Sequence, residues 1–390
     1  MNIEKQQPMR KNISLLLLLL IYIPMYSFGQ NKNIHTQLEE IAHKHKAIGL
    51  TVAVVKDNKI IYKHALGYSD LNKAEKMTTD HIFRIASISK SFTATALMQL
   101  IEEGKLSLED DFSDLIGFKV RNPHYPDDVI TLGMILSHSS SINDKNGYFT
   151  LDVIDPRKNE EWEACYNDYK PGSQYEYCNL NFNMAGAVIE RITGNRFDKE
   201  IQKRILEPLK LKAGYNVDGL KQNRFAKLYS YDKSKSKFIV QPDAYNSPQK
   251  YLNDYELGRS TPVFSPTGGM KISTNDLTRY MLMHMNYGSW EGTKVISVES
   301  AKIMQDPVIN TVYGGYGLAL THNTTIIPTE NMVGHTGDAY GLYSNMYFEP
   351  ENKFGFVVIT NGCEADYDSN ENMLFSKEVI NFLYDYFIAG

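Results

Sequence analysis

The sequence predicts an α+β fold in which both ends of the chain form one antiparallel sheet. Strand-like runs form a hairpin near the start, at residues 50–55 and 59–68. A matching hairpin lies near the end, at residues 342–348 and 354–360, and a helix-like stretch over 373–387 follows it. The sequence between the two hairpins is mostly helical. We therefore expect one sheet built from both chain ends and flanked by helices, with an inserted, mainly helical lobe.

Composition favours a large, well-packed domain. Of the 390 residues, 42% are hydrophobic, and no low-complexity tract interrupts the chain. We expect the domain to cover residues 30–390, with a sheet lobe of about 31–85 and 265–390 and a helical lobe of about 86–264. The net charge is −5 with both signs interspersed, which predicts binding to neither nucleic acid nor a membrane surface.

The first residues are typical of a secretory signal peptide, which we expect to cover residues 1–29. Three basic residues precede an apolar run over 15–23, and the small residues Ser27 and Gly29 follow. The alternative is a membrane anchor, but the apolar run is shorter than the roughly 20 residues that a spanning helix needs. We therefore expect an exported, periplasmic or extracellular protein with no stable membrane span after signal removal.

After a short amphipathic helix over 34–45 and the first hairpin, a second helix is predicted over 85–101. Apolar or small residues recur through it at helical spacing, so it should be buried nearly all round. Lys90 is the only charged residue inside it. A buried ammonium is costly, and burial lowers a lysine pKa toward the range where the neutral amine can act as a base.

Ser87 lies three residues before Lys90, on the same face at the start of this helix. The hydroxyl and the amine are then within mutual reach, which is the arrangement of an activated serine nucleophile. The alternative is that Lys90 merely extends from a core helix toward solvent. The same Ser-x-x-Lys spacing recurs in a polar stretch where both partners would be hydrated, at Ser230/Lys233, Ser234/Lys237 and Ser247/Lys250.

His138 ends a helix predicted over 132–138. It could be taken for a general base, but the sequence offers it no identifiable partner. A histidine that holds the turn by hydrogen bonds is therefore the better interpretation.

Tyr177 and Asn179 lie on a short polar loop that enters another predicted helix, a usual setting for catalytic groups. A charged Lys90 would lower the pKa of Tyr177. Either the phenolate or the neutral amine could then take the serine proton and pass it to the leaving group.

The last third of the chain contains two segments of interest. Residues 218–263 are polar and tyrosine-rich, with a predicted hairpin around 232–235, and could be a surface excursion or could line a substrate cleft. A helix capped near Ser273 or Thr274 follows. Glycines in the loop 334–341 would let a substrate backbone lie along an edge strand, and main-chain N–H groups there could donate to an oxyanion; a plain turn is the alternative.

The three cysteines, Cys165, Cys178 and Cys363, do not make a disulfide framework. Export would permit one bridge, and a bridge between Cys165 and Cys178 is conceivable. The odd count and the wide spacing favour small buried residues instead.

These candidate residues stand in four short motifs. They are Phe83–Lys90, Leu136–Ser140, Pro171-Gly172 before Tyr177-Cys178-Asn179, and Gly334–Gly337. Their order and flanking residues resemble the serine hydrolases related to class C β-lactamases and D-alanyl-D-alanine carboxypeptidases. The resemblance extends from about residue 34 onward and includes residues 207–211 and the Gly268-Gly269 turn with Ser273-Thr274.

The resemblance implies a penicillin-recognising fold of the β-lactamase/transpeptidase type, with the active site between the two lobes. It also implies acylation of a serine followed by hydrolysis, with no metal or organic cofactor. The residue roles that it implies are Ser87 as nucleophile, Lys90 as proton acceptor, Tyr177 as proton relay and activator of water, Asn179 as binder of the substrate amide, His335, Thr336 and Gly337 as the substrate-binding edge strand, and the N–H groups of Ser87 and Asp338 as the oxyanion hole.

Two positions depart from the family pattern. Cys178 stands where the family usually has Ser or Ala, which is a small change. His335 replaces the Lys of true class C β-lactamases, and a histidine is largely neutral near pH 7. The site should therefore hold an anionic substrate less firmly unless a nearby arginine substitutes.

We accordingly expect an exported serine hydrolase of peptidase, amidase or esterase type. Its substrate would be a small molecule or a peptide, with D-amino-acid or cell-wall peptides and peptidoglycan fragments among the candidates. Two alternatives stay open: a class C-like β-lactamase or D-alanyl-D-alanine carboxypeptidase, and a non-catalytic relative that binds peptide or cell-wall fragments.

Overall fold

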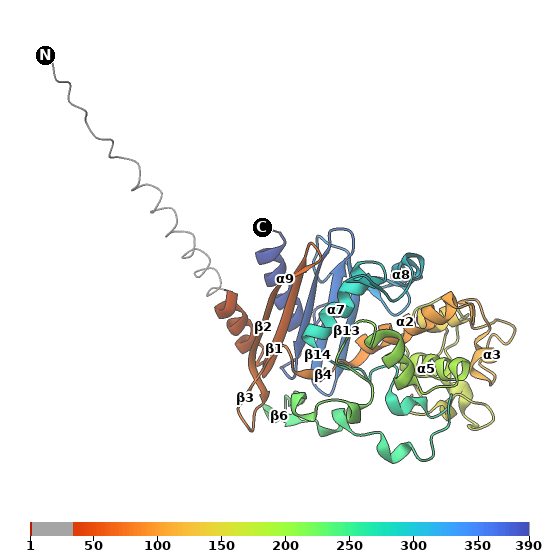
Figure 1. The fold of residues 1–390 in the computed structure, drawn as a ribbon. Helices are drawn as coiled ribbons and strands as arrows, with labels where there is room; N and C mark the ends of the chain where they lie inside the picture. Colours follow the sequence, from red (N-terminus) through yellow and green to blue (C-terminus); the bar gives the residue numbers. More distant parts are fainter. Residues whose placement is uncertain (2–33, 390) are drawn as a thin grey trace.

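The computed structural model describes Met1 and residues 34–389 (Figure 1). The predicted signal peptide, apart from Met1, lies outside these described residues. Within the described part of the chain, every helix is too short or too polar to cross a membrane.

A large antiparallel sheet organises the described chain. Nine strands pair in the order β10-β11-β12-β13-β14-β15-β1-β2-β3, so the first strand lies beside the last one. This pairing confirms the predicted sheet built from both chain ends. The strands are β1 (Gly49–Lys56), β2 (Lys59–Asp70), β3 (Glu75–Lys76), β10 (Ile309–Thr311), β11 (Gly314–Tyr316), β12 (Thr321–Asn323), β13 (Met332–Ala339), β14 (Leu342–Glu349) and β15 (Phe354–Thr360).

Helices cover both faces of this sheet because side chains alternate along its central strands. In β1, Leu50, Val52 and Val54 belong to one apolar cluster, which includes α9 (Leu374–Phe387) and the helix over 34–44. Ala53 and Val55 face the opposite side, toward α7 (Thr274–Met285). Figure 1 shows α7 and α9 on opposite sides of the sheet.

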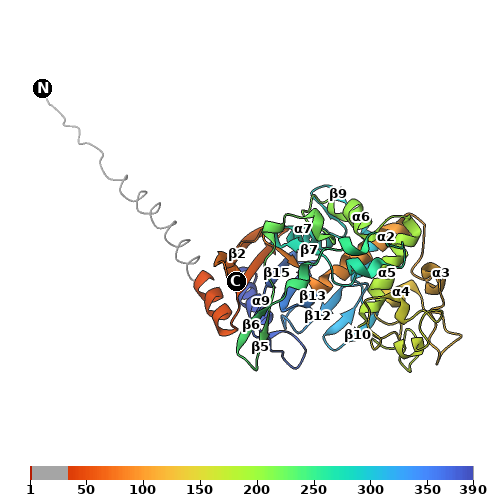
Figure 2. The same ribbon diagram turned by 90° about the horizontal axis from the view of Figure 1, so that it is seen from below.

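The remaining helices gather beside the sheet (Figure 2). The longest are α2 (Ser89–Glu102) and α5 (Asn179–Thr193), which pack together in one apolar core. Around them lie α3 (Phe112–Ile116), α4 (Leu132–Leu136) and α6 (Phe197–Ile201), while α8 (Val298–Gln305) contacts α2. A hydrogen bond from Ala319 N to Leu136 O, 3.1 Å long, ties the end of α4 to the chain between β11 and β12.

Six short strands form two-residue to four-residue ribbons outside the main sheet. They are β4 (Ile82–Arg84) with β7 (Lys271–Ser273), β5 (Tyr229–Asp232) with β6 (Lys237–Val240), and β8 (Ser289–Trp290) with β9 (Thr293–Lys294). Short turns of 3-10 helix occupy Ala86–Ile88, Leu151–Val153, Trp162–Cys165, Val217–Gly219, Gln222–Arg224, Pro242–Tyr245, Gln249–Tyr251 and Thr261–Phe264, and a π-helical turn covers Gln202–Leu206.

Several predicted elements are confirmed. The β5–β6 ribbon is the hairpin expected around 232–235, and α5 is the helix expected after Tyr177 and Asn179. Ser273 caps α7, because its side chain accepts a hydrogen bond from Asp276 N. The helix α2 is buried almost all round, as its sequence predicts.

The edge strand expected at His335, Thr336 and Gly337 is confirmed, because residues 333–339 pair with β14, and the alternative of a plain turn over 334–341 does not hold. On the other side β12 pairs only with residues 332–334, so residues 335–339 form a locally free edge. The helix expected over 85–101 is interrupted, since Ala86 takes a φ of 49° and a 3-10 turn precedes α2.

Candidate active site

Ser87 lies in the 3-10 turn that connects β4 to α2. The preceding residue, Ala86, has a φ of 49°, a conformation that costs a non-glycine residue energy and is concentrated at functional sites. Ser89 Oγ donates to Ala86 O at 2.5 Å and so helps to hold the turn. Ser87 itself is half-buried and lines a cavity of about 520 Å³.

Lys90 lies in the first turn of α2, and its side chain is completely buried. Its Nζ lies 3.0 Å from Ser87 Oγ, 2.9 Å from Asn179 Oδ1 and 3.0 Å from Thr267 O. Three oxygen atoms therefore fix the amine beside the serine hydroxyl. The structure brings the two residues together as the sequence predicts.

Burial lowers the pKa of Lys90 to about 7, although the nearby Asp144 and Cys178 act in the opposite direction. Near neutral pH a large fraction of the amine is consequently unprotonated. A neutral amine at hydrogen-bond distance from a hydroxyl is able to accept its proton.

Tyr177 stands over the same amine, with its ring centre 4.6 Å from Lys90 Nζ. Burial raises the pKa of Tyr177 above its ordinary value, and a hydrogen bond with Ser87 offsets this only in part. The phenol is therefore protonated at neutral pH. The sequence left two proton acceptors open. The raised pKa of Tyr177 and the lowered pKa of Lys90 favour the Lys90 amine over a Tyr177 phenolate.

Asn179 makes its polar contacts inside the protein. Its Oδ1 accepts from Lys90 Nζ and, at 2.8 Å, from Thr267 Oγ1, while its Nδ2 donates to Asp144 Oδ2 at 3.0 Å. These bonds make Asn179 a holder of the lysine. One N–H of its amide is left for the substrate contact that the family resemblance implies.

Asp144 is a site residue that the sequence analysis missed. Its carboxylate accepts from Asn179 N at 2.8 Å and from Leu180 N at 2.9 Å, at the first turn of α5. It thereby fixes both α5 and the Asn179 side chain. The sequence contains no signal for this role. Asp144 precedes Asn179 by 35 residues and Leu180 by 36, and a contact across so long a connection cannot be predicted from residue spacing.

His335 is buried on β13, with an exposed fraction of 4%. Its Nδ1 lies 2.6 Å from Thr336 O and its Nε2 lies 3.1 Å from Tyr316 OH, which fits a neutral ring that donates at Nδ1 and accepts at Nε2. Burial and, to a smaller extent, Lys90 lower the pKa of His335 to about 3. The imidazole is neutral, as expected from the sequence.

The next three residues of β13 extend along the cavity that holds Ser87. A Cβ on Gly337 would lie 2.2 Å from Ile85 O, so only glycine allows β13 to approach the turn before Ser87 this closely. Thr336 and Asp338 are exposed and line the cavity. Tyr367 OH donates to Asp338 Oδ2 at 3.0 Å.

His138 holds a turn, as we interpreted it from the sequence. Its Nδ1 accepts from Cys178 N at 3.1 Å, and its carbonyl oxygen accepts from Glu176 N at 2.9 Å. Burial lowers the pKa of His138 well below its ordinary value, so the ring carries no charge. The three cysteines are buried free thiols, and Cys165 and Cys178 are not bridged.

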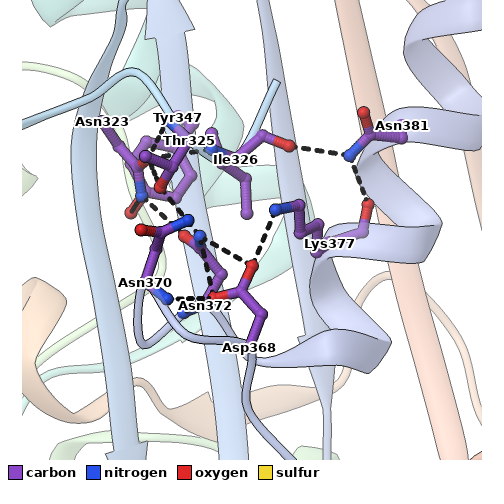
Figure 3. A network of polar contacts seen from close by, with 9 residues as sticks. All are labelled: Asn323, Thr325, Ile326, Tyr347, Asp368, Asn370, Asn372, Lys377 and Asn381. Carbon is purple, nitrogen blue, oxygen red and sulfur yellow. Dashed lines mark hydrogen bonds and ion pairs between the residues drawn. The ribbon is translucent and has the colours of Figure 1, made fainter. Parts of the chain in front are cut away.

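A second cavity of about 160 Å³ adjoins the first across β13 and shares Tyr177 and His335 with it. Asn323, Tyr347 and Asn372 belong to its lining and to a polar network that anchors the chain between β15 and α9 (Figure 3). At the centre of this network, the carboxylate of Asp368 accepts from Asn370 N, Asn372 N and Lys377 Nζ. The network fixes the wall of the second cavity.

Arg84 is an arginine close to Ser87. It lines the same cavity as Ser87, and its guanidinium carbon lies 5.0 Å from the centre of the Tyr340 ring. Its Nε donates to Gly268 O at 3.0 Å. Within the described residues, Arg84 forms no ion pair.

Comparison with known sequences places these motifs in a family. The sequence model of the Beta-lactamase family matches residues 34–374. Protein flp of Staphylococcus aureus (strain MRSA252) is 27% identical over 347 residues, which cover 85% of this chain and 62% of that protein. The chain therefore spans less than two thirds of the length of this relative.

Two solved structures share the fold. The octameric penicillin-binding protein homologue from Pyrococcus abyssi has a TM-score of 0.71 at 25% identity, over 90% of this chain and 76% of that one. D-amino acid amidase from Ochrobactrum anthropi SV3, complexed with D-phenylalanine, has a TM-score of 0.69 at 20% identity, over 92% of this chain and 98% of that one. The predicted α+β fold of the β-lactamase/transpeptidase type is confirmed.

The resemblance inferred from four short motifs is thus confirmed over most of the chain. All four motifs lie within the matched residues 34–374, and residues from each of them meet around Ser87 and Lys90. The chain belongs to the Beta-lactamase family.

Proposed function

We propose that the protein is an exported serine hydrolase that cleaves an amide or an ester through an acyl-serine intermediate. The observation that carries this proposal is the distance of 3.0 Å between Lys90 Nζ and Ser87 Oγ, with the amine fully buried. A neutral amine beside a hydroxyl can act as its base. Burial of a lysine side chain costs free energy, so a fully buried lysine at this place indicates a use.

In the proposed reaction, Lys90 Nζ accepts the proton of Ser87 Oγ as this oxygen attacks the carbonyl carbon of the substrate. The bond from that carbon to the leaving nitrogen or oxygen breaks, and the leaving group takes a proton through Lys90 and the phenol of Tyr177. Water then attacks the acyl-serine, which releases the acid and restores Ser87. The N–H groups of Ser87 and Asp338 would stabilise the oxyanion in both steps.

The neutral His335 favours peptidase, amidase or esterase activity over efficient hydrolysis of β-lactams. A fixed positive charge is suited to the carboxylate of a β-lactam, and burial keeps this histidine uncharged. The amidase that shares the fold makes D-amino-acid derivatives and cell-wall peptides reasonable first substrates. A β-lactamase or D-alanyl-D-alanine carboxypeptidase is the second candidate, since a penicillin-binding protein homologue shares the fold as well.

Covalent labelling tests the proposal. A fluorescent phosphonate and a fluorescent penicillin are incubated with the purified protein and with Ser87→Ala. We expect the phosphonate to label the wild-type protein and to leave Ser87→Ala unlabelled, because the phosphonate reacts with an activated serine. Ser230→Ala, which removes another serine with a lysine three residues later, should keep wild-type labelling.

Two outcomes would contradict the proposal. Equal labelling of Ser87→Ala would place the nucleophile elsewhere. Folded wild-type protein that reacts with neither probe would favour a non-catalytic relative that binds peptide or cell-wall fragments. A panel of D-amino-acid amides, D-Ala-D-Ala peptides, short-chain esters and a cephalosporin would then identify the leaving group of the active protein.

A further inference from the structure

Two basic side chains face each other on the β4–β7 ribbon beside Ser87. Arg84 of β4 is paired in register with Lys271 of β7. A charge on Arg84 disfavours a second charge on the residue directly opposite it. No ion pair joins Arg84 or Lys271 to a carboxylate anywhere in the described residues. The ribbon therefore holds a guanidinium and a buried amine without a carboxylate partner.

Lys271 is the more unusual of the two, because only 6% of its surface is exposed. Its Nζ donates to Tyr215 O at 2.7 Å, which leaves at least one further N–H of the amine as a donor. Burial and the nearby Arg84 lower the pKa of Lys271 well below its ordinary value. Such a side chain is costly to bury and has donors to spare.

A small cavity of about 100 Å³ is lined by Arg84 and Lys271. Arg84 and Ser265 line this cavity and also the larger one that holds Ser87. Arg84 is three residues from Ser87 along the chain, so their Cα atoms are at most about 11 Å apart. A group bound between Arg84 and Lys271 is consequently within reach of a substrate that is attached at Ser87.

Two carboxylates lie near this cavity without neutralising it. Asp243 lines it and accepts from Asn246 Nδ2 at 3.0 Å. Asp218 attracts Lys271 from a distance and accepts from Ser247 Oγ at 2.7 Å. Asp243 and Asp218 are both exposed. Neither carboxylate comes within ion-pair distance of Arg84 or Lys271.

We propose that Arg84 and Lys271 form a binding site for a carboxylate carried by the substrate, so that the enzyme prefers substrates with a free acid group. The proposal rests on the proposed function, because it assumes that the substrate reacts at Ser87. A carboxylate placed there would accept from the guanidinium and from the free donors of Lys271, and its negative charge would favour the protonated form of the Lys271 amine. Arg84 would then provide the positive charge that the neutral His335 lacks.

Matched phosphonate probes test this proposal. Each probe is an ethyl 4-nitrophenyl alkylphosphonate that releases 4-nitrophenolate when it reacts with the serine. In one series the alkyl chain ends in a methyl group or in a carboxylate, and in a second series the ethoxy group is lengthened and carries the same two ends. The measured quantity is the ratio of second-order rate constants, carboxylate over methyl, for chains of increasing length.

We expect the wild-type ratio to exceed about ten for at least one chain length, because hydrogen bonds to an ionised carboxylate are about twice as strong as those between neutral groups. Lys271→Met should bring that ratio close to one, and Arg84→Gln should reduce it in the same way. Lys250→Met is the matched control, since Lys250 is an exposed lysine whose Nζ lies over the Tyr251 ring at 4.7 Å. It should keep the wild-type ratio.

The outcomes distinguish a failure of the carboxylate site from a failure of the proposed hydrolase function. Reaction with the methyl probes but no preference for any carboxylate probe would overturn the carboxylate site and leave the hydrolase intact. A preference that survives both Lys271→Met and Arg84→Gln would also overturn it. No reaction of folded wild-type protein with any probe would contradict the proposed function, and the carboxylate site with it. If Lys271→Met does not fold, Arg84→Gln alone decides.

Discussion

The Ser-x-x-Lys pair at Ser87/Lys90 and the pair at Ser230/Lys233 have the same spacing in very different surroundings. In the first, Lys90 is buried in α2 and touches the serine oxygen at 3.0 Å. In the second, Lys233 is exposed next to the β5–β6 ribbon and donates to Asp366 at 2.7 Å. Burial lowers the pKa of Lys90 to about 7, whereas the hydrogen bond with Asp366 raises the pKa of Lys233.

The difference supports the proposed role of Lys90 as a base, because the two pairs share their spacing and differ in solvent exclusion. In water a lysine keeps its proton far above neutral pH, and a serine beside it stays an ordinary hydroxyl. Inside α2 the amine loses the water that would stabilise its charge, and three neighbouring oxygens then hold it in one place. The Ser-x-x-Lys motif therefore predicts a nucleophile only where apolar residues surround it.

Removing the two lysines should give the largest contrast. We expect Lys90→Ala to slow acylation of Ser87 by about 10²- to 10⁴-fold, the usual contribution of a positioned general base. Lys233→Ala should leave the rate unchanged, because its amine is solvated and distant from the nucleophile. The rate of phosphonate labelling, measured for both variants beside the wild-type protein, checks this prediction.

Folding must be verified for Lys90→Ala by its melting temperature and its circular dichroism spectrum, since the substitution leaves a gap in the core. Normal acylation in a folded Lys90→Ala protein would show that another group takes the serine proton. Tyr177 would then be the first residue to test.

The pH dependence of acylation should follow Lys90 directly. The neutral amine is the active form and has a pKa of about 7, so the rate should be constant above this pH. Below it the rate should fall about tenfold for each pH unit, because the protonated fraction grows by that factor. A labelling profile between about pH 5 and about pH 9 measures this. A rate that still rises steeply above about pH 9 would instead indicate a base with an ordinary lysine or phenol pKa.

Asp144 should move this profile by a smaller amount. Its negative charge raises the pKa of Lys90, so Asp144→Asn should shift the midpoint of the profile to lower pH, by up to about one unit. The variant should also unfold more easily, by about 1 kcal/mol, because the first N–H groups of α5 lose a charged acceptor. Asp366→Asn, which alters the partner of the exposed Lys233, should leave the midpoint in place. A shift to higher pH in Asp144→Asn would contradict this account of the charge around Lys90.

Much of the sheet could be predicted from the sequence because long strands carry a clear alternation. β1, β2, β14 and β15 alternate apolar residues toward two helical layers, and that pattern survives in the local sequence. The strand character of β13 could be predicted only through the family resemblance, since its glycines favour a turn as well and the pairing with β14 makes it a strand. The three-residue strands β10, β11 and β12 are too short to give any periodic signal.

The candidate site could be predicted only where its residues lie in motifs. Ser87, Lys90, Tyr177 and His335 come together as the family pattern implies. Asp144 and Thr267 could not be found, because they act on Lys90 and Asn179 from distant parts of the chain. Lys271 is similar: its sequence neighbours do not show that it is buried opposite Arg84.

The smallest effect is expected from the ion pair between Lys233 and Asp366. It joins the β5–β6 ribbon to the chain after β15, and both side chains are largely exposed. Water screens such a pair, and salt weakens it further. We expect Lys233→Ala to lower the melting temperature slightly at about 0.05 M salt and not measurably at about 0.5 M. A loss of stability that persists at high salt would mean that Lys233 contributes packing as well as charge, and the contrast between a solvated lysine and the buried Lys90 would then be less sharp than the structure indicates.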